Sequence, residues 1–348
     1  MKVGLFDHIE DGGRPLAQLF DERLAFIQAA DEAGFYCLHL AEHHQTPLNM
    51  VPVPGVFLGA VARMTRRIKM GPLVYLLPLM SPLRMIDEIC MLDHLTHGRA
   101  EIGVGRGVSP FELKYHKIEH DQSREIFIDA YRCIQAGLGA DVLTYKGPHH
   151  EYDNVPIALR PLQQPHPPFW YGSSGAEGSA WAGAEGLHFV TLGPNGFAKE
   201  NIETFKAAFA KRGGKAAQPK PEFSGGVAIG VQRHIFVDET DEKARAWAKP
   251  AMEKHLEHIN WIRTRHGVTA TATRMKNVRG QNFEECVEEG TAIAGSPRTV
   301  LAELQRQHAE IGFNYLLTYL FLGNMSADTA MRSLKLFTAE VMPALERM

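Results

Sequence analysis

The stretch Leu38-His-Leu-Ala-Glu-His-His-Gln45 decides how the chain is interpreted, because a buried strand ends there in ionisable side chains. The apolar residues 36–40 predict a short strand, and Glu42, His43 and His44 follow it without a turn glycine. In parallel α/β folds, ligands bind at the carboxyl ends of the strands. Because histidine titrates near neutral pH, this strand end is a candidate proton-transfer site. The alternative is that Glu42 and one histidine satisfy each other and cap the next loop.

The same order of strand, loop and helix recurs along the chain. Apolar runs predict eight strands, at residues 2–6, 36–40, 68–77, 99–104, 169–171, 187–192, 227–237 and 314–320. Helical spacing follows these runs at 16–33, 55–64, 82–94, 123–138, 175–185, 200–211, 241–266, 297–310 and 327–345. Strands that alternate with helices imply a parallel sheet, and eight such units fit a closed (β/α)8 TIM-like barrel better than an open sheet.

Two segments depart from this repeat. Residues 142–160 alternate in character and contain Gly147-Pro148 and Asn154, which predicts a β-hairpin excursion. Residues 267–282 have little hydrophobic pattern and several Thr, Arg and Gly, a composition typical of a mobile lid. Since the chain shows no internal repeat, low-complexity tract or convincing linker, we expect residues 1–348 to form a single domain.

Composition limits the partners that the chain can have. The formal net charge is −3, so no basic field is available to replace the counterions of nucleic acid. Four scattered cysteines without a Cys-x-x-Cys pair favour reduced thiols over a disulfide framework or a zinc site. The apolar run at the start of the sequence is too short for a signal peptide. The apolar run 73–80 is too short to span a membrane. We therefore expect a soluble, cytoplasmic protein that binds neither nucleic acid nor membrane.

Two glycine-containing loops could hold a charged ligand. The segment Gly98-Arg-Ala-Glu-Ile-Gly-Val-Gly-Arg-Gly107 lets the backbone approach a ligand closely, although a tight turn with a surface arginine explains it equally well. In Gly172-Ser-Ser-Gly-Ala-Glu-Gly-Ser179, two serines and free N–H groups at the start of a helix suit one phosphate, or form an ordinary N-cap. Arg124 could pair with the same phosphate or lie on the surface as a common helix arginine.

Eight short motifs are weak individually but specific in their order and spacing. They are the Met-Lys-Val-Gly-Leu-Phe start, Ala41-Glu-His-His44, Leu77-Pro-Leu-Met-Ser-Pro-Leu-Arg84, Leu92-Asp-His-Leu-Thr-His-Gly-Arg99, Gly105-Arg-Gly107, Ser123-Arg124, Ser173-Ser174 and Leu336-Phe-Thr-Ala-Glu-Val-Met-Pro343. With these motifs the chain resembles the bacterial luciferase-like flavin monooxygenases over essentially its whole length. The resemblance implies a TIM-like barrel that binds FMN, or its reduced form, at the carboxyl ends of the strands.

The resemblance also implies roles for individual residues. His43 matches the family's catalytic histidine, and Glu42 is its neighbour in the motif. Leu73-Val74 stands where the family has a non-prolyl cis peptide bond under the flavin ring. The implied phosphate site consists of side chains and backbone N–H groups from Arg106, Arg124, Ser173, Ser174, Val108 and Gly175. Gly105 replaces a cysteine of light-emitting luciferases, so we expect no carry-over of light emission and free space for a different substrate.

In this family, reduced flavin reacts with oxygen to give a C4a-hydroperoxide, which oxygenates a substrate or decays to peroxide. The resemblance therefore implies a monooxygenase that acts on paired donors and uses reduced FMN from a separate reductase. Its substrate would be a small apolar organic molecule, His43 would be the base or hydrogen-bonding partner of the intermediate, and the chain would form a homodimer.

Three alternatives remain open. One is an oxidoreductase of the same fold that uses the deazaflavin F420 for hydride transfer, and another is a non-catalytic flavin-binding protein. The third is a metal-dependent barrel hydrolase with Glu42, His43 and His44 as ligands. No His-x-His or His-Glu-x-x-His spacing occurs among the seventeen histidines, so we predict no metal site.

Overall fold

A barrel of parallel strands forms the centre of the computed structural model, which describes residues 1–268 and 282–348. Its strands are β1 (Lys2–Asp7), β2 (Cys37–Leu40), β3 (Lys69–Pro72), β4 (Tyr75–Leu76), β5 (Ile102–Gly105), β8 (Phe169–Ser173), β9 (His188–Thr191), β10 (Ile229–Val237), β11 (Ala292–Gly295) and β12 (Tyr315–Tyr319). They pair in the order β3-β2-β1-β12-β10-β9-β8-β5-β4, and β11 pairs with the end of β10.

The ring closes where β3 and β4 meet. Only Leu73 and Val74 separate these two strands in the chain, and a parallel bridge between Met70 and Ala100 joins β3 to the residues before β5. The peptide bond between Leu73 and Val74 is cis, as the resemblance implied. The predicted third strand is therefore a strand broken in two, and the predicted TIM-like barrel is confirmed.

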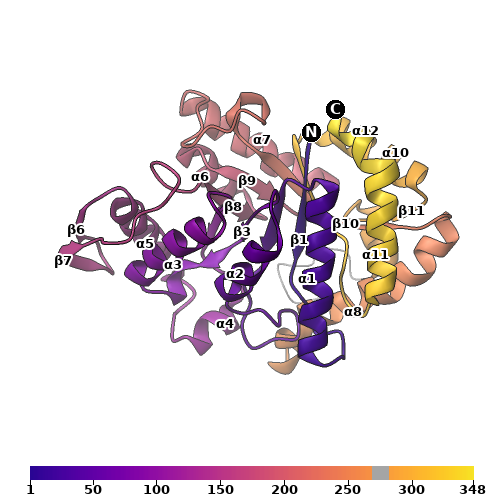
Figure 1. Cartoon of the computed structure of the whole chain (residues 1–348), viewed down its shortest axis with the longest axis horizontal. Coiled ribbons are helices and arrows are strands. Elements are labelled where there is room, and N and C mark those ends of the chain that lie inside the picture. The colour runs from indigo at the N-terminus through magenta and orange to yellow at the C-terminus, as the bar shows by residue number, and fades with distance from the viewer. Residues whose placement is uncertain (269–281) are drawn as a thin grey trace.

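Helices surround the barrel on the outside, as Figure 1 shows. The long ones are α1 (Leu16–Ala33), α2 (Pro54–Met64), α3 (Pro82–Leu95), α5 (Ser123–Leu138), α6 (Ala176–Glu185), α7 (Asn195–Lys211), α8 (Asp241–Arg265), α10 (Pro297–Ile311) and α11 (Ala327–Leu336). Shorter ones are η1 (Leu77–Leu79), α4 (Pro110–Tyr115), η2 (Ser224–Gly226), α9 (Phe283–Glu288), the π-helical turn η5 (Phe337–Val341) and α12 (Met342–Glu346). Three of these elements, α4, α9 and β11, were not predicted from the sequence.

Local chemistry explains where several of these helices begin and end. The side chain of Thr240 accepts a hydrogen bond from the backbone N–H of Lys243 and so caps α8. Ser296 caps α10 in the same way. Gly34 ends α1 in the left-handed conformation (φ 92°), which costs glycine less than any other residue.

The two predicted excursions have different outcomes. The hairpin is confirmed, since β6 (Val142–Lys146) and β7 (Glu151–Pro156) pair antiparallel and project from one end of the molecule (Figure 1). The predicted lid at 267–282 falls almost entirely on residues 269–281, which lie outside the described residues. None of the helices among the described residues combines the length and the hydrophobicity that a membrane span requires.

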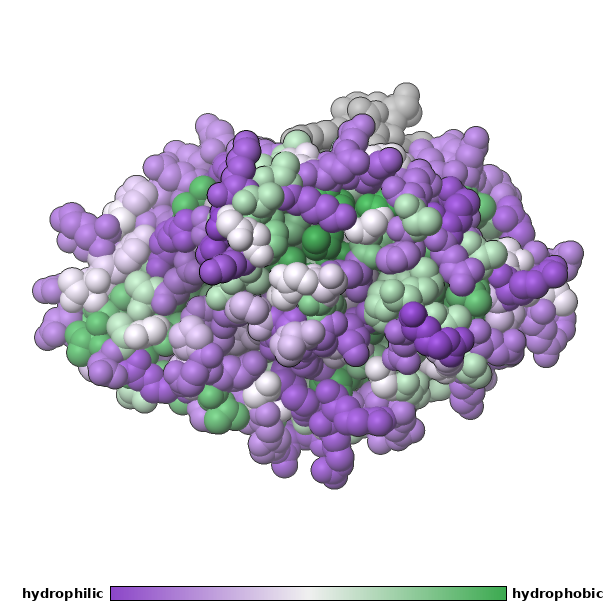
Figure 2. All heavy atoms as spheres, turned by 90° about the horizontal axis from the view of Figure 1, so that it is seen from above, coloured by the Kyte–Doolittle hydropathy of each residue, from purple (hydrophilic) through white to green (hydrophobic). Residues whose placement is uncertain are grey.

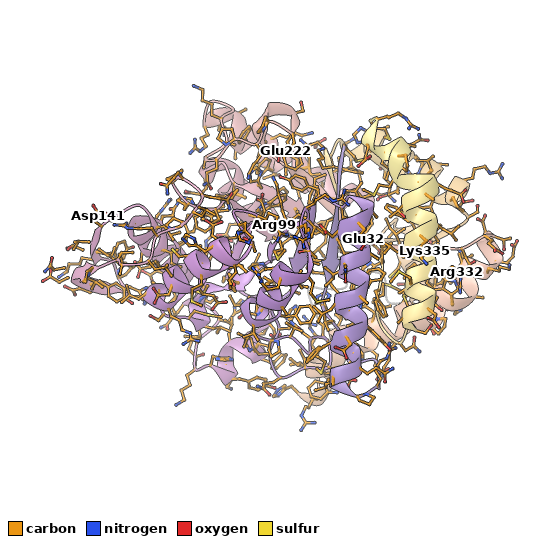
Figure 3. All side chains as sticks on the ribbon, viewed as in Figure 1. Glu32, Arg99, Asp141, Glu222, Arg332 and Lys335 are labelled. Carbon is orange, nitrogen blue, oxygen red and sulfur yellow. The ribbon has the colours of Figure 1, made fainter. Side chains whose placement is uncertain are left out.

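The end of the barrel at which the strands begin is closed by charged and aromatic side chains. Glu222, labelled in the upper part of Figure 3, accepts hydrogen bonds from Lys69 Nζ (2.7 Å) and from the hydroxyl of Tyr36 (2.9 Å). Lys69 Nζ also lies 3.5 Å from Oε1 of Glu101, inside the barrel. Seen from this end, the surface is largely hydrophilic with small apolar groups (Figure 2). Loops at the opposite end are therefore the place to look for a ligand site.

Candidate functional site

A pocket opens at the carboxyl ends of β1 and β2, between α4 and α8. It encloses about 520 Å³, its opening to solvent included. The residues that line it are His8, His43, Thr46, Leu48, Val108, Ser109, Glu112, Ile259, Ile262 and Arg263. A second cavity, of about 350 Å³, lies on another side of the barrel near Tyr131, His166 and Gln218, and its lining contains none of the site residues predicted from the sequence. The pocket between α4 and α8 is therefore the candidate site.

His43 lies in this pocket and is held by Glu112. The Nδ1 atom of His43 is 3.1 Å from Oε1 and 3.3 Å from Oε2 of Glu112, and the backbone N–H of His44 donates to the same carboxylate at 2.8 Å. Burial alone would raise the pKa of Glu112, but the charge and hydrogen bonds of His43 outweigh it, and the net effect lowers the pKa. An ionised carboxylate at Nδ1 fixes the tautomer of His43 and makes Nε2 the nitrogen that can accept a proton.

Glu42 contacts His44 rather than the ring of His43. The Nε2 atom of His44 is 2.9 Å from Oε1 of Glu42, and the backbone N–H of Leu76 donates to Oε2 at 3.2 Å. Burial raises the pKa of Glu42, and the hydrogen bond that His44 donates to Glu42 raises the pKa of His44. Glu42 therefore ties the end of β2 to β4 and orients His44.

This division of partners separates the side chains that the metal-hydrolase alternative needs together. His43 is bonded to Glu112, whereas Glu42 and His44 are bonded to each other. Across residues 1–268 and 282–348, no group of three His, Cys, Asp or Glu side chains is arranged to hold a metal ion.

Glu112 was not predicted as a site residue, although a local helix-start signal is present around it. Ser109-Pro110-Phe111-Glu112 has the spacing of a capping box with proline at the first helical position. In the structure the Ser109 side chain accepts a hydrogen bond from the backbone N–H of Glu112 (3.3 Å) and starts α4. The carboxylate of Glu112 is thereby presented to His43, 69 residues earlier in the chain.

A second missed carboxylate, Glu10, fastens α8 to the barrel. Its Oε1 accepts hydrogen bonds from Nδ1 of His255 (2.8 Å) and from the hydroxyl of Tyr319 (2.7 Å). Its Oε2 accepts one from Nδ1 of His258 at 2.7 Å. Burial would raise the pKa of Glu10, but the charge of His255 and the hydrogen bonds from His255 and His258 hold it well below its usual value. Glu10 and these two histidines form what we call the α8 clamp.

His8 connects the clamp to the floor of the pocket. Its ring lies nearly parallel to that of His43, with the centroids 5.5 Å apart and an interplanar angle of 26°. On the other side, its centroid is 5.7 Å from that of His255. Imidazole rings from β1, β2 and α8 therefore follow one another from the pocket into the interior.

The predicted phosphate residues lie where β5, α5 and β8 meet. Ser173 ends β8, and the backbone N–H of Gly175 donates to its hydroxyl at 3.2 Å just before α6 begins. Nε of Arg124 is 2.9 Å from Oε1 of Glu177, in the first turn of α6. Ser174, which follows Ser173 and precedes Gly175 in the chain, is half-buried. This part of the site already binds one anionic group, the Glu177 carboxylate, at the guanidinium of Arg124.

Arg106 belongs to the same region. Burial raises the pKa of Tyr171 on β8, and the positive charges of Arg124 and Arg106 both oppose that rise. The charges of both arginines therefore reach Tyr171, which lies two positions before Ser173 on the same strand. The side chain of Val108, two residues after Arg106 in the chain, is 63% exposed and lines the pocket.

The cis peptide bond between Leu73 and Val74 lies beside Gly105 of β5 and Gly172 of β8. A Cβ atom on Gly172 would lie 3.8 Å from side-chain atoms of both Leu73 and Val74. A Cβ atom on Gly105 would lie only 2.3 Å from Cγ2 of Val74. The expectation that Gly105 leaves space for a substrate is therefore wrong, because the Val74 side chain fills that space.

Comparison with known proteins identifies the relatives of this chain. Residues 1–315 match the family model described as luciferase-like monooxygenase. An uncharacterised protein, y4wF, from Sinorhizobium fredii is 34% identical over 98% of this chain and 96% of its own length. The oxygenase component of a flavin-dependent trigonelline monooxygenase from Acinetobacter baylyi is 24% identical over 99% of this chain and 95% of its own length.

Solved structures of the same fold cover nearly the whole chain. The monooxygenase RslO1 from Streptomyces bottropensis has a TM-score of 0.85 at 22% identity and covers 99% of both chains. The oxygenating constituent of 3,6-diketocamphane monooxygenase from Pseudomonas putida, a type II Baeyer–Villiger enzyme in complex with FMN, has a TM-score of 0.79 at 20% identity over 99% of this chain and 98% of that one. A coenzyme F420-dependent tetrahydromethanopterin reductase from Methanopyrus kandleri has a TM-score of 0.72 at 17% identity over 99% of this chain and 100% of that one. At these identities the likeness shows the fold alone.

Proposed function

The chain belongs to the luciferase-like monooxygenase family, and from this premise we propose that it is a monooxygenase that uses reduced FMN and O2 to oxygenate a small organic substrate. Its relatives are monooxygenases, including flavin-dependent ones, which supports an oxygenase activity. One observation carries the proposal furthest. The His43–Glu112 pair opens onto a pocket with apolar side chains, and Val108 in the lining of that pocket lies two residues after Arg106 in the chain.

The residues present fit a flavin with one phosphate. We propose that the phosphate binds to the group predicted above, namely Arg106, Arg124, Ser173, Ser174 and the backbone N–H groups of Val108 and Gly175. A helix start with a guanidinium group beside it suits a phosphate, and Arg124 already pairs with a carboxylate there. The ring would then lie against Leu73 and Val74. When bound, reduced FMN supplies the electrons that activate O2 for transfer of one oxygen atom.

Within this proposal the chain's own residues orient the substrate and move a proton. His43 exchanges the proton at Nε2, because Nδ1 is held by Glu112. Glu42 is a positioning residue that acts through His44. The apolar side chains of Leu48, Ile259 and Ile262 reduce the access of water to the pocket, which strengthens its polar interactions.

A second candidate function is F420-dependent hydride transfer, since F420-dependent enzymes share this fold. To separate the two, the purified protein is titrated anaerobically with reduced FMN and, separately, with reduced F420, and oxygen uptake is then recorded. We expect binding of reduced FMN and oxygen uptake on mixing with O2. If the protein binds reduced F420 tightly but does not bind reduced FMN, and no oxygen is taken up, F420-dependent hydride transfer becomes the favoured function. Turnover no faster than that of free reduced FMN would favour the non-catalytic flavin-binding protein.

The remaining expectations also belong to this proposal. Because a relative is the oxygenase component of a flavin-dependent system, we propose that a separate reductase supplies reduced FMN. Reduced FMN and the organic substrate are then the paired donors, and O2 is the oxidant whose oxygen atom is incorporated. A homodimer has support in exposed apolar side chains on the neighbouring helices α2 and α3, namely Val56, Met64, Met91 and Leu95. Light scattering of the purified chain measures the oligomeric state. A cytoplasmic location stays a prediction.

A further inference from the structure

Arg263, on α8, is a cationic side chain in the pocket whose charge no carboxylate neutralises directly. Within the described residues its one hydrogen bond is to the backbone carbonyl of Ile259 (3.0 Å), in its own helix, and it forms no ion pair. The acid near it is Glu112, whose oxygens are bonded to His43 and to the backbone N–H of His44. By sequence, residues 269–281 contain no Asp or Glu that could serve as a counter-ion.

A half-buried arginine in this position needs an explanation. Arginine keeps its charge in proteins, and a charge that is partly removed from water costs free energy unless an anion pairs with it. The guanidinium shares the pocket with the apolar side chains of Leu48, Ile259 and Ile262. A guanidinium beside apolar walls can bind a carboxylate through two parallel hydrogen bonds and leave an apolar ligand body on those walls.

We propose that Arg263 binds the carboxylate of a substrate that has an apolar body, and so determines the substrate class of the pocket. The inference rests on the proposed function and specifies it. One guanidinium balances one negative charge, whereas the carboxylate of Glu112 nearby disfavours a dianion such as a phosphate ester. The apolar body then lies between Arg263 and His43, where the reaction is proposed to occur.

The structure holds α8, and with it Arg263, at both sides. The α8 clamp binds the helix through His258, five positions before Arg263. Just after the helix, the ring of His266 stacks on Phe111 of α4 with centroids 4.4 Å apart, and its Nε2 lies 2.7 Å from the Tyr115 hydroxyl. Fixed supports on both sides preorganise the cation, which lowers the cost of binding.

The test compares carboxylates with their neutral amides. Benzoate, phenylacetate, nicotinate and cyclohexanecarboxylate, each with its primary amide, are titrated by calorimetry into the wild-type protein and into Arg263→Met and Arg263→Lys. Arg265→Met is the matched control, because Arg265 is exposed, lies over the Trp261 ring and does not line the pocket. We expect at least one carboxylate to bind the wild type about tenfold or more tighter than its amide. Arg263→Met should abolish that preference, Arg263→Lys should keep part of it, and the control should keep all of it.

Two results would overturn the inference. One is that no carboxylate in the panel binds more tightly than its amide, and the other is that Arg263→Met keeps the preference. Anaerobic titration with reduced FMN separates this outcome from the fate of the proposed function. We expect Arg263→Met to bind reduced FMN as the wild type does. A wild type that does not bind reduced FMN would refute the proposed function and leave the carboxylate preference as an independent result. Loss of reduced FMN binding in Arg263→Met would instead assign Arg263 to the cofactor.

Discussion

His43 is useful as a proton acceptor because a buried carboxylate holds its other nitrogen. Nδ1 of His43 lies within 3.1 Å of Glu112, and Glu112 is itself held by the backbone N–H of His44. The motif that contains His43 was visible in the sequence. Its partner was not, since no local pattern connects residues that are 69 positions apart.

The first prediction concerns His43 itself. His43→Ala should lower oxygenation of a coupled substrate by about 10² or more, which is the usual contribution of a positioned acid or base. The affinity for reduced FMN should remain within about twofold, because the proposed phosphate residues are untouched. Product formation and reduced FMN binding are measured in parallel. Unchanged product formation would contradict the proton-exchange role proposed for His43.

The second prediction concerns its partner. Glu112→Gln keeps the size of the side chain but removes the charge that fixes the tautomer of His43. Losses of about 10- to 100-fold in oxygenation are typical when such a supporting carboxylate is removed. Free peroxide should rise relative to product as coupling fails. A matched variant is Glu119→Gln, an exposed glutamate in the loop between α4 and α5, which should behave as the wild type. An equal response of both variants would contradict the assigned role of Glu112.

Among the elements, α8 is held by hydrogen bonds to Glu10 that could not be predicted from the sequence of the helix itself. His255 and His258 lie three positions apart on one side of the helix and both bond Glu10, which is more than 240 residues away. Long periodic helices were predicted well, and α1 and α5 have the predicted bounds. The short elements β11 and α4 were missed, although strands as short as β2 and β9 were predicted, because four to six residues show little periodicity.

The third prediction tests the clamp on α8. Glu10→Gln should lower the free energy of unfolding by about 2–4 kcal/mol at pH 7, because a buried carboxylate with several hydrogen bonds is lost. In the folded protein the pKa of Glu10 lies below its unfolded value, so the contribution is complete above a pH of about 4.3 and is lost as the pH falls through the lowered pKa.

The measurement is urea unfolding of the wild type and Glu10→Gln from pH 7 to pH 3. The difference in the free energy of unfolding between the two proteins should stay constant down to about pH 5 and then become smaller. The control is Glu257→Gln on the exposed side of the same helix, which should change stability by less than about 0.5 kcal/mol. If this difference in the free energy of unfolding instead increases as the pH falls, the assigned ionisation of Glu10 is wrong.

At the scale of the whole molecule, the two ends of the barrel differ. The end where the strands begin is closed by Lys69, Glu222 and Tyr36, and the opposite end carries the pocket and the proposed phosphate residues. The order of strands and helices predicted this barrel, because each strand in turn showed an apolar run followed by a helical period. The break between β3 and β4 was not visible in apolar patterning, which ran through it, and only the resemblance pointed to Leu73-Val74.

The most direct test of the central claim compares reduced FMN with reduced riboflavin, which has the same ring but no phosphate. Anaerobic titrations are followed by flavin fluorescence in the wild type, in Arg106→Ala and in Arg132→Ala, whose arginine pairs with Glu185 on the outer helices. We expect the wild type and Arg132→Ala to bind reduced FMN at least about tenfold tighter than reduced riboflavin, and Arg106→Ala to lose most of that preference. Equal binding of the two flavins to the wild type would contradict the account.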